Sequence, residues 1–148
     1  MNSSSLLMTI GYEGLKPEDF LERLKENKVC FLVDVRQNSN SRKKGFSKSQ
    51  LEIFLKDNGI NYIHFQKLGT PPELRQRLKE EQNYDTFFEE YKTYLMKQEE
   101  YLDSLKKLAE KTTSCLMCFE KDYQECHRKI ISSVIEEISA RELKVVHI

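Results

Sequence analysis

The sequence lacks a net charge, a long hydrophobic run and a leader, and each lack excludes a class of protein. Its 24 Lys and Arg side chains balance 24 Asp and Glu side chains, so overall attraction cannot hold it on nucleic acid or a membrane. The apolar runs are too short to cross a bilayer. Residues 1–5 lack the charged region and apolar stretch of a signal peptide. We therefore expect a cytoplasmic protein that does not bind membranes.

Internal repeats, low-complexity tracts and linkers are also absent, which predicts one domain over residues 1–148. A chain of this length can bury about 68–70% of its unfolded surface, so its core needs no disulfide or metal. In the cytosol the four cysteines stay reduced and serve as packing residues or chemical groups. Neither a Gly-x-Gly-x-x-Gly nor a Gly-Lys-Ser/Thr phosphate-binding fingerprint is present.

Short β-rich segments alternate with helical patterns along the chain. Most of the segments are continuously apolar, as buried parallel strands are. They lie at 6–10, 29–35, 61–65, 114–119 and 144–148. Residues 67–113 make a long crossover with at least two helices, which predicts a helical insertion beside the ligand crevice, with Arg75 on its first helix. The pattern predicts a three-layer α/β sandwich with a mostly parallel sheet of about five strands.

Local signals place two of the helix ends. Pro17 suits a first helical position. Ser47 and Gln50 have the spacing of a capping box, and Gly59 suits the left-handed stop of that helix.

The last helix carries an apolar stripe that turns its N-terminal residues toward the sheet. The stripe comprises Ile130, Ile131, Val134, Ile135 and Ile138. Cys126 and His127 stand four residues before it and face the sheet, whereas Arg128 lies on a flank. If the helix begins near Glu125, its free amides attract an anion there. If Asp122 caps the helix instead, with Glu125 closing a capping box, the anion-attracting amides lie nearer to Asp122 in the sequence.

Charged residues follow the apolar runs at three places in the sequence. Glu13 follows the first run, Asp34 and Arg36 end the second, and Glu120 follows the fourth. In an open parallel sheet, ligands bind in the crevice outside the carboxyl ends of the strands. We therefore expect these four side chains in one site.

Seven short motifs in order give the chain a family resemblance. They are Thr9-Ile10-Gly11-Tyr12-Glu13-Gly14, Leu32-Val33-Asp34-Val35-Arg36, Ser41-Arg42, Phe46-Ser47-Lys48, Gly59-Ile60-Asn61-Tyr62 with Leu68-Gly69, Cys118-Phe119-Glu120-Lys121, and Cys126-His127-Arg128. In these motifs, across nearly its whole length, the chain resembles the domain-of-unknown-function 488 family of prokaryotic proteins. One position departs, because Ser39 stands where the family usually has proline. The resemblance implies the same fold and the same crevice residues, and it implies no substrate.

Carboxylates crowded into a crevice are suited to acid-base catalysis, because their pKa values are driven apart. Asp34, Glu120 and Glu13 are the candidate catalytic residues. The alternative is that Asp34 or Glu120 pairs with an arginine and locks two loops together.

Six further residues are candidates for binding the substrate. Guanidinium groups match phosphate oxygens, which favours Arg36, Arg128 and Arg42 as anion ligands. Ser41, His127 and Tyr12 are assigned to the pocket lining. Tyr12 could stack on a base or sugar, or it could simply pack over a tight turn.

The cysteines and histidines admit two further kinds of chemistry. Cys126 and Cys118 are candidate nucleophiles, with plain buried side chains as the alternative for both; Cys30 and Cys115 are expected to be buried packing residues. Residues three apart on a strand face opposite sides, so Cys115 and Cys118 cannot hold one zinc ion. A divalent metal held by Asp34, Glu120 and His127 stays open, but no metal or cofactor is expected.

Three functions follow from these residues. The leading one is a hydrolase-like enzyme that acts on a nucleotide or other phosphate-bearing small molecule by carboxylate acid-base catalysis. The second is a non-catalytic module that binds nucleic acid through the basic loop of residues 36–48. The third is a cysteine-dependent enzyme of rhodanese-like or phosphatase-like type. Oligomeric state, substrate and reaction stay open.

Overall fold

The computed structural model describes residues 5–148. Residues 1–4, on which most of the expectation about a signal peptide rests, lie outside the described residues. Within residues 5–148, no helix has both the length and the hydropathy that a membrane span needs.

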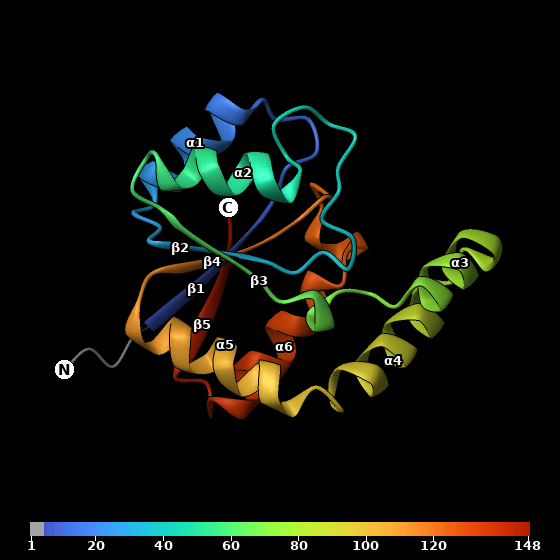
Figure 1. Ribbon diagram of the computed structural model, residues 1–148. Coiled ribbons are helices and arrows are strands. Elements are labelled where there is room, and N and C mark those ends of the chain that lie inside the picture. The colour runs from blue at the N-terminus through green and yellow to red at the C-terminus, as the bar shows by residue number, and fades with distance from the viewer. Residues whose placement is uncertain (1–4) are drawn as a thin grey trace.

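Five parallel strands form one sheet at the centre of the molecule (Figure 1). They are β1 (Ser5–Gly11), β2 (Phe31–Asp34), β3 (Asn61–His64), β4 (Ser114–Cys118) and β5 (Leu143–His147). Their order in the sheet is β3-β2-β4-β1-β5. Each strand lies where an apolar run predicted it, with small differences at the ends. The predicted α/β sandwich is confirmed, and the sheet is parallel throughout.

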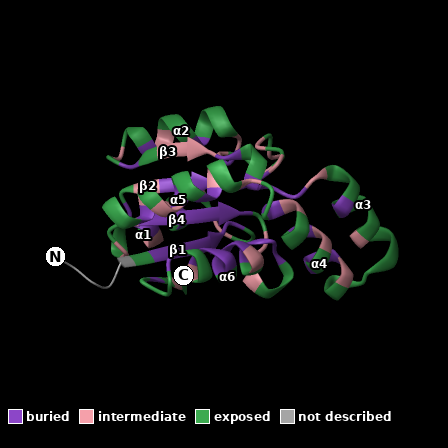
Figure 2. Ribbon diagram, turned by 90° about the horizontal axis from the view of Figure 1, so that it is seen from below, coloured by how far each residue is buried: buried purple, intermediate pink, exposed green. Residues whose placement is uncertain are grey.

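Helices cover both faces of this sheet, because each strand presents apolar side chains on both sides (Figure 1). The helices α1 (Pro17–Glu26) and α2 (Lys48–Lys56) cover one face, and α5 (Glu99–Lys111) and α6 (Arg128–Ile138) cover the other. Leu32 and Leu116 illustrate the two cores, since both are fully buried and belong to different clusters. Burying a leucine side chain stabilises the fold by about 1.5–3 kcal/mol. Figure 2 shows β4 and most of β1 as buried.

The predicted capping box at α2 is wrong, although the helix itself is present. Ser47 precedes the helix, but its hydroxyl donates to Ser41 O at 2.9 Å rather than capping α2. Gln50 accepts from the Gly45 amide at 3.1 Å instead of from Ser47. Both side chains therefore hold the preceding loop. Gly59 adopts the expected left-handed conformation, with φ of +78°.

The predicted insertion between β3 and β4 contains three helices. After the short turn η1 (Gln66–Leu68), α3 (Pro72–Glu81) and α4 (Tyr84–Leu95) pack together as a hairpin that projects from the sheet, and α5 follows (Figure 1). This placement brings one side of α3 next to the loops that leave the sheet.

Both predicted starts of the last helix are wrong. Asp122 caps the short turn η2 (Tyr123–Glu125) by accepting from the Gln124 amide at 2.9 Å, and α6 begins only at Arg128. Arg128, expected on a flank of this helix, is 1% exposed, and its side chain turns inward to donate to Thr9 Oγ1. Cys30 is exposed, contrary to expectation, whereas Cys115 is buried as expected.

Candidate functional site

The carboxyl ends of β1, β2 and β4 meet at one edge, as their registers require. Gly11 of β1 pairs with Cys118 of β4, and Asp34 of β2 pairs with Met117. The residues that follow these strands therefore leave the sheet side by side. This edge holds the predicted residues Tyr12, Glu13, Asp34, Arg36 and Glu120.

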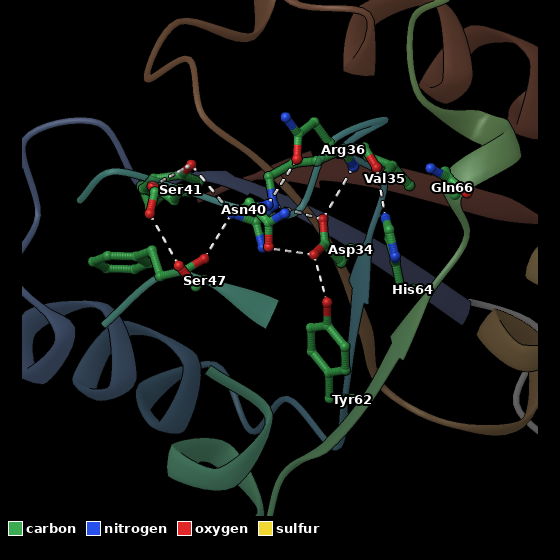
Figure 3. Close-up of polar contacts among 12 residues, drawn as sticks. Asp34, Val35, Arg36, Asn40, Ser41, Ser47, Tyr62, His64 and Gln66 are labelled. Carbon is green, nitrogen blue, oxygen red and sulfur yellow. Dashed lines mark hydrogen bonds and ion pairs between the residues drawn. The ribbon is translucent and has the colours of Figure 1, made fainter. Parts of the chain in front are cut away.

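Asp34 lies in a buried cluster whose polar groups are paired (Figure 3). Its carboxylate accepts from Arg36 Nε at 2.9 Å and Nη2 at 2.7 Å, and from the Tyr62 hydroxyl at 2.6 Å. Arg36 Nη1 donates to Phe46 O at 2.7 Å and to the Tyr12 hydroxyl at 3.2 Å. Asp34 is 0% exposed. This geometry favours the loop-locking alternative for Asp34, whose acid-base role stays a prediction.

Electrostatics within this cluster follow from the buried ion pair. Burial opposes the charge of Arg36, but its hydrogen bonds and attraction to Asp34 raise the pKa of the guanidinium above its usual value. Burial and the Asp34 charge both raise the pKa of Tyr62. Both groups therefore keep their protons, and the cluster stays an ion pair with a phenol donor.

Hydrogen bonds from two side chains outside β2 hold the backbone of residues 36–37, which follow that strand. His64 Nε2 donates to Arg36 O at 2.6 Å, and Gln66 Nε2 donates to Gln37 O at 3.0 Å (Figure 3). Gly69 allows the next loop to approach, because a Cβ there would lie 2.2 Å from Gln37 N. The 36–37 backbone is thus held between β3 and the start of the insertion.

Tyr12 packs over the edge and shows mainly its hydroxyl to the site. Its ring stacks on Phe46 at 4.5 Å between centroids, which occupies one face. Its hydroxyl donates to Ser41 Oγ at 3.3 Å. Glu13 is exposed, and its carboxylate accepts from the Lys121 amide at 2.9 Å. Both residues thereby tie neighbouring loops together.

Arg128 and Gly11 position the backbone of Glu120. Arg128 Nη2 donates to Glu120 O at 2.5 Å, and Nη1 donates to Thr9 Oγ1 at 2.9 Å. A Cβ on Gly11 would lie 1.8 Å from Glu120 O, so only glycine fits. Arg128 therefore acts on Glu120 through the carbonyl, and its role as an anion ligand stays a prediction.

The Glu120 side chain reaches toward solvent and toward the insertion. It is 26% exposed, and its carboxylate lies 3.9 Å from Arg75 Nη2 of α3. Burial, together with the nearby Cys126 charge, raises the pKa of Glu120 to about 7, although His127 and Arg75 oppose the shift.

Two thiols and an imidazole gather beside Glu120. Ligand atoms of Cys118, Glu120, Cys126 and His127 all lie within 4.8 Å of one another. Burial opposes ionisation of Cys126, but the Cys118 thiol and the charges of His127 and Arg128 lower its pKa. Burial raises the pKa of Cys118. Cys115 belongs to the core on the other face of the sheet, as its spacing from Cys118 predicts.

A basic cleft of about 680 Å³ opens between the 36–43 loop and α3. Its cationic lining side chains are Arg36, Arg42, Lys43, Arg75 and Lys79. Glu120 is the one carboxylate that lines it among the described residues. Tyr12 and Ser41 also lie in its wall. Arg75 lies on the first helix of the insertion beside the crevice, as predicted. No local pattern in the sequence indicated that Lys79 lines the same cleft.

An adjoining cleft of about 620 Å³ lies on the other side of Glu120. It shares Arg75, Lys79 and Glu120 with the basic cleft, and His127 reaches its wall. Thr70 also lines it, and within residues 5–148 the buried Thr70 hydroxyl has no hydrogen-bond partner. Glu120 therefore stands between the basic cleft and the thiol-imidazole group.

Comparison with known proteins confirms the family. Searches of the curated proteins and of the solved structures found no match. The sequence model of the family described as Domain of unknown function DUF488 matches residues 16–135, which is most of the chain. This range includes Asp34, Arg36, Arg75, Glu120 and Cys126. The chain belongs to the family described as Domain of unknown function DUF488.

Proposed function

We propose that this protein is an enzyme that binds a phosphate-bearing, nucleotide-like small molecule in the basic cleft and hydrolyses it. One observation carries the proposal: among the described residues, five cationic side chains, three of them exposed, and a single carboxylate line the same cleft in a chain with no net charge. Guanidinium groups match phosphate oxygens in shape and charge. A local concentration of positive charge at one sheet edge favours an anionic ligand there.

Within the cleft, the proposed role of each residue follows from its exposure and its hydrogen-bond partners. Arg42, Arg75 and Lys79 are exposed and can turn toward a phosphate, although Arg75 also lies 3.9 Å from the Glu120 carboxylate, whereas Arg36 is already neutralised by Asp34. Glu120 takes a proton from a water molecule while the water oxygen attacks phosphorus. The bond from phosphorus to the leaving oxygen breaks in the same step. Glu120 then passes that proton to the departing oxygen, which restores the carboxylate. Asp34 positions Arg36 and the loop that carries Arg42.

Calorimetric titration with inorganic pyrophosphate tests the cleft, and α3 offers a matched pair of variants. Arg75 and Arg77 are 56% and 46% exposed, but only Arg75 lines the basic cleft. A charge-assisted contact contributes about 1.5–3 kcal/mol, so Arg75→Ala weakens pyrophosphate binding about 10-fold or more. Arg77→Ala leaves the affinity close to the wild-type value. Equal affinities in the two variants would contradict the proposal.

The nucleic-acid alternative is weakened by the basic loop itself. Arg36 is paired with Asp34, and Lys43 donates to Tyr12 O at 3.0 Å, so only part of the predicted basic patch is free. A module resting on several phosphate contacts loses affinity steeply as salt rises. Titration with single-stranded RNA over a range of salt concentrations distinguishes this module from an enclosed small-molecule site.

The cysteine-dependent alternative rests on the pair formed by Cys126 and His127. Their ring nitrogen and sulfur lie 3.5 Å apart, as in a thiolate-imidazolium pair. Cys126 is only 1% exposed, so the structure leaves a substrate little access to its sulfur. This favours the carboxylate mechanism, and it leaves the purpose of the two thiols to be explained.

A further inference from the structure

Three buried side chains beside the basic cleft carry the donor atoms that bind soft metal ions. Cys118, Cys126 and His127 are each at most 2% exposed; Cys118 ends β4, and Cys126 and His127 immediately precede α6. Their donor atoms lie within 4.8 Å of one another. In a tetrahedral zinc site the bonds are about 2.0–2.3 Å long, which places donor atoms roughly 3.3–3.8 Å apart, inside this limit.

The orientation of His127 is that of a metal ligand. Its Nε2 donates to Val35 O at 2.7 Å, which leaves Nδ1 without a proton in the neutral ring. That Nδ1 faces Cys126 Sγ at 3.5 Å. Metal-bound histidines almost always donate their other ring N–H to a carbonyl or carboxylate in this way. The ring is also fixed from the side by the buried Tyr91, whose ring meets it edge to face.

The surroundings of Cys126 favour a bound thiolate. The Arg128 amide donates to Cys126 Sγ at 3.4 Å, at the first turn of α6. The buried Arg128 guanidinium adds a positive charge close by, which favours the thiolate form of Cys126 before an ion binds. Sulfur and imidazole ligands select zinc over magnesium or calcium.

The fourth position of such a site faces Glu120. Glu120 is 26% exposed, whereas the three other side chains are buried, so it lies on the solvent side of the group. His127 and Glu120 both line the adjoining cleft. Asp34, considered with Glu120 and His127 from the sequence, is fully engaged by Arg36 and Tyr62 and is not part of this group.

We infer that Cys118, Cys126 and His127 bind a zinc ion through two sulfur atoms and Nδ1, with Glu120 beside the open fourth position. The inference goes beyond the anion cleft, because it requires no phosphate ligand. Three protein ligands with an open position are the arrangement of catalytic zinc sites, where the ion activates a bound water.

The test uses cobalt as a spectroscopic substitute for zinc, and β4 offers a matched control. The protein is stripped of metal under reducing conditions and titrated with Co²⁺. We expect one equivalent to bind, with the intense thiolate-to-cobalt absorption of a tetrahedral site, and Zn²⁺ to displace it. Cys118→Ser loses this absorption. Cys115→Ser, the same change at a buried position on the other face of β4, keeps it.

Three results would overturn the inference. The first is cobalt binding without thiolate absorption, and the second is the same metal content in the two serine variants. The third is loss of the ion in Glu120→Gln, which would contradict the three-ligand assignment. Pyrophosphate binding is measured separately on the same samples, so failure of the metal site and failure of the basic cleft are told apart.

Discussion

Two polar clusters lie at the same edge of the sheet and differ in how fully their groups are paired. In the cluster of Asp34, Arg36 and Tyr62, each carboxylate oxygen accepts hydrogen bonds and the charges cancel. In the group of Cys118, Cys126 and His127, the donor atoms converge on one another, no carboxylate-guanidinium pair closes the group, and Glu120 extends from it into the clefts.

The difference suggests a division of roles between the two clusters, which we propose as part of the function. A buried ion pair with good geometry fixes the chain, because breaking it leaves a charge without a partner. Converging donor atoms beside open space can instead take a ligand or an ion. We therefore propose that the Asp34 cluster is the framework and that Glu120 with its neighbours is the reactive side of the edge.

The largest expected effect comes from breaking the closed cluster. Asp34→Asn leaves Arg36 buried without its countercharge, and the free energy of unfolding falls by about 3–5 kcal/mol. Urea denaturation measures the loss. Glu90→Gln is the control, because it breaks the more exposed pair with Arg77 and costs about 0–1 kcal/mol. Similar losses in both variants would show that Asp34 has no special role in the framework.

A glycine substitution tests whether the position of the Glu120 backbone matters. In Gly11→Ala the new Cβ lies 1.8 Å from Glu120 O, so the loop must shift. We expect a loss of about 1–3 kcal/mol from overpacking, together with weaker pyrophosphate binding in calorimetry. Gly59→Ala is the control, since its φ of +78° strains any other residue in open space far from the clefts.

Both glycine variants lower the melting temperature, but only Gly11→Ala changes the binding of pyrophosphate. If Gly11→Ala bound pyrophosphate with wild-type affinity, the position of the Glu120 backbone would not control the basic cleft, and this part of the account would be wrong.

The sequence predicts the sheet edge well because the signal there is local. Apolar runs that end in charged residues locate Asp34, Arg36 and Glu120, and parallel strands bring their ends to one edge. The same pattern cannot show that Tyr62, from a neighbouring strand, completes the Asp34 cluster, because that depends on register. The inward turn of Arg128 is also invisible, since it depends on the helix starting only at that residue.

The insertion shows a second limit. Arg75 was expected beside the crevice from the length of the crossover alone. Lys79 and Thr70 were not, because the direction in which α3 leaves the sheet is set by its packing on α4. The cysteine spacing correctly separated Cys115 from Cys118, but it gave no sign that Cys118 meets Cys126.

The smallest and most direct effect concerns the charge of Glu120 itself. Glu120 stands among cationic groups, so at mildly alkaline pH its carboxylate repels a bound anion while the arginines attract it. One unit charge about 4 Å away changes the binding free energy by about 1 kcal/mol where bulk water screens it. The measurement is calorimetric titration of inorganic pyrophosphate into the wild-type protein and Glu120→Gln. We predict tighter binding in Glu120→Gln with little change in melting temperature; equal or weaker binding would contradict the placement of Glu120 against the bound anion.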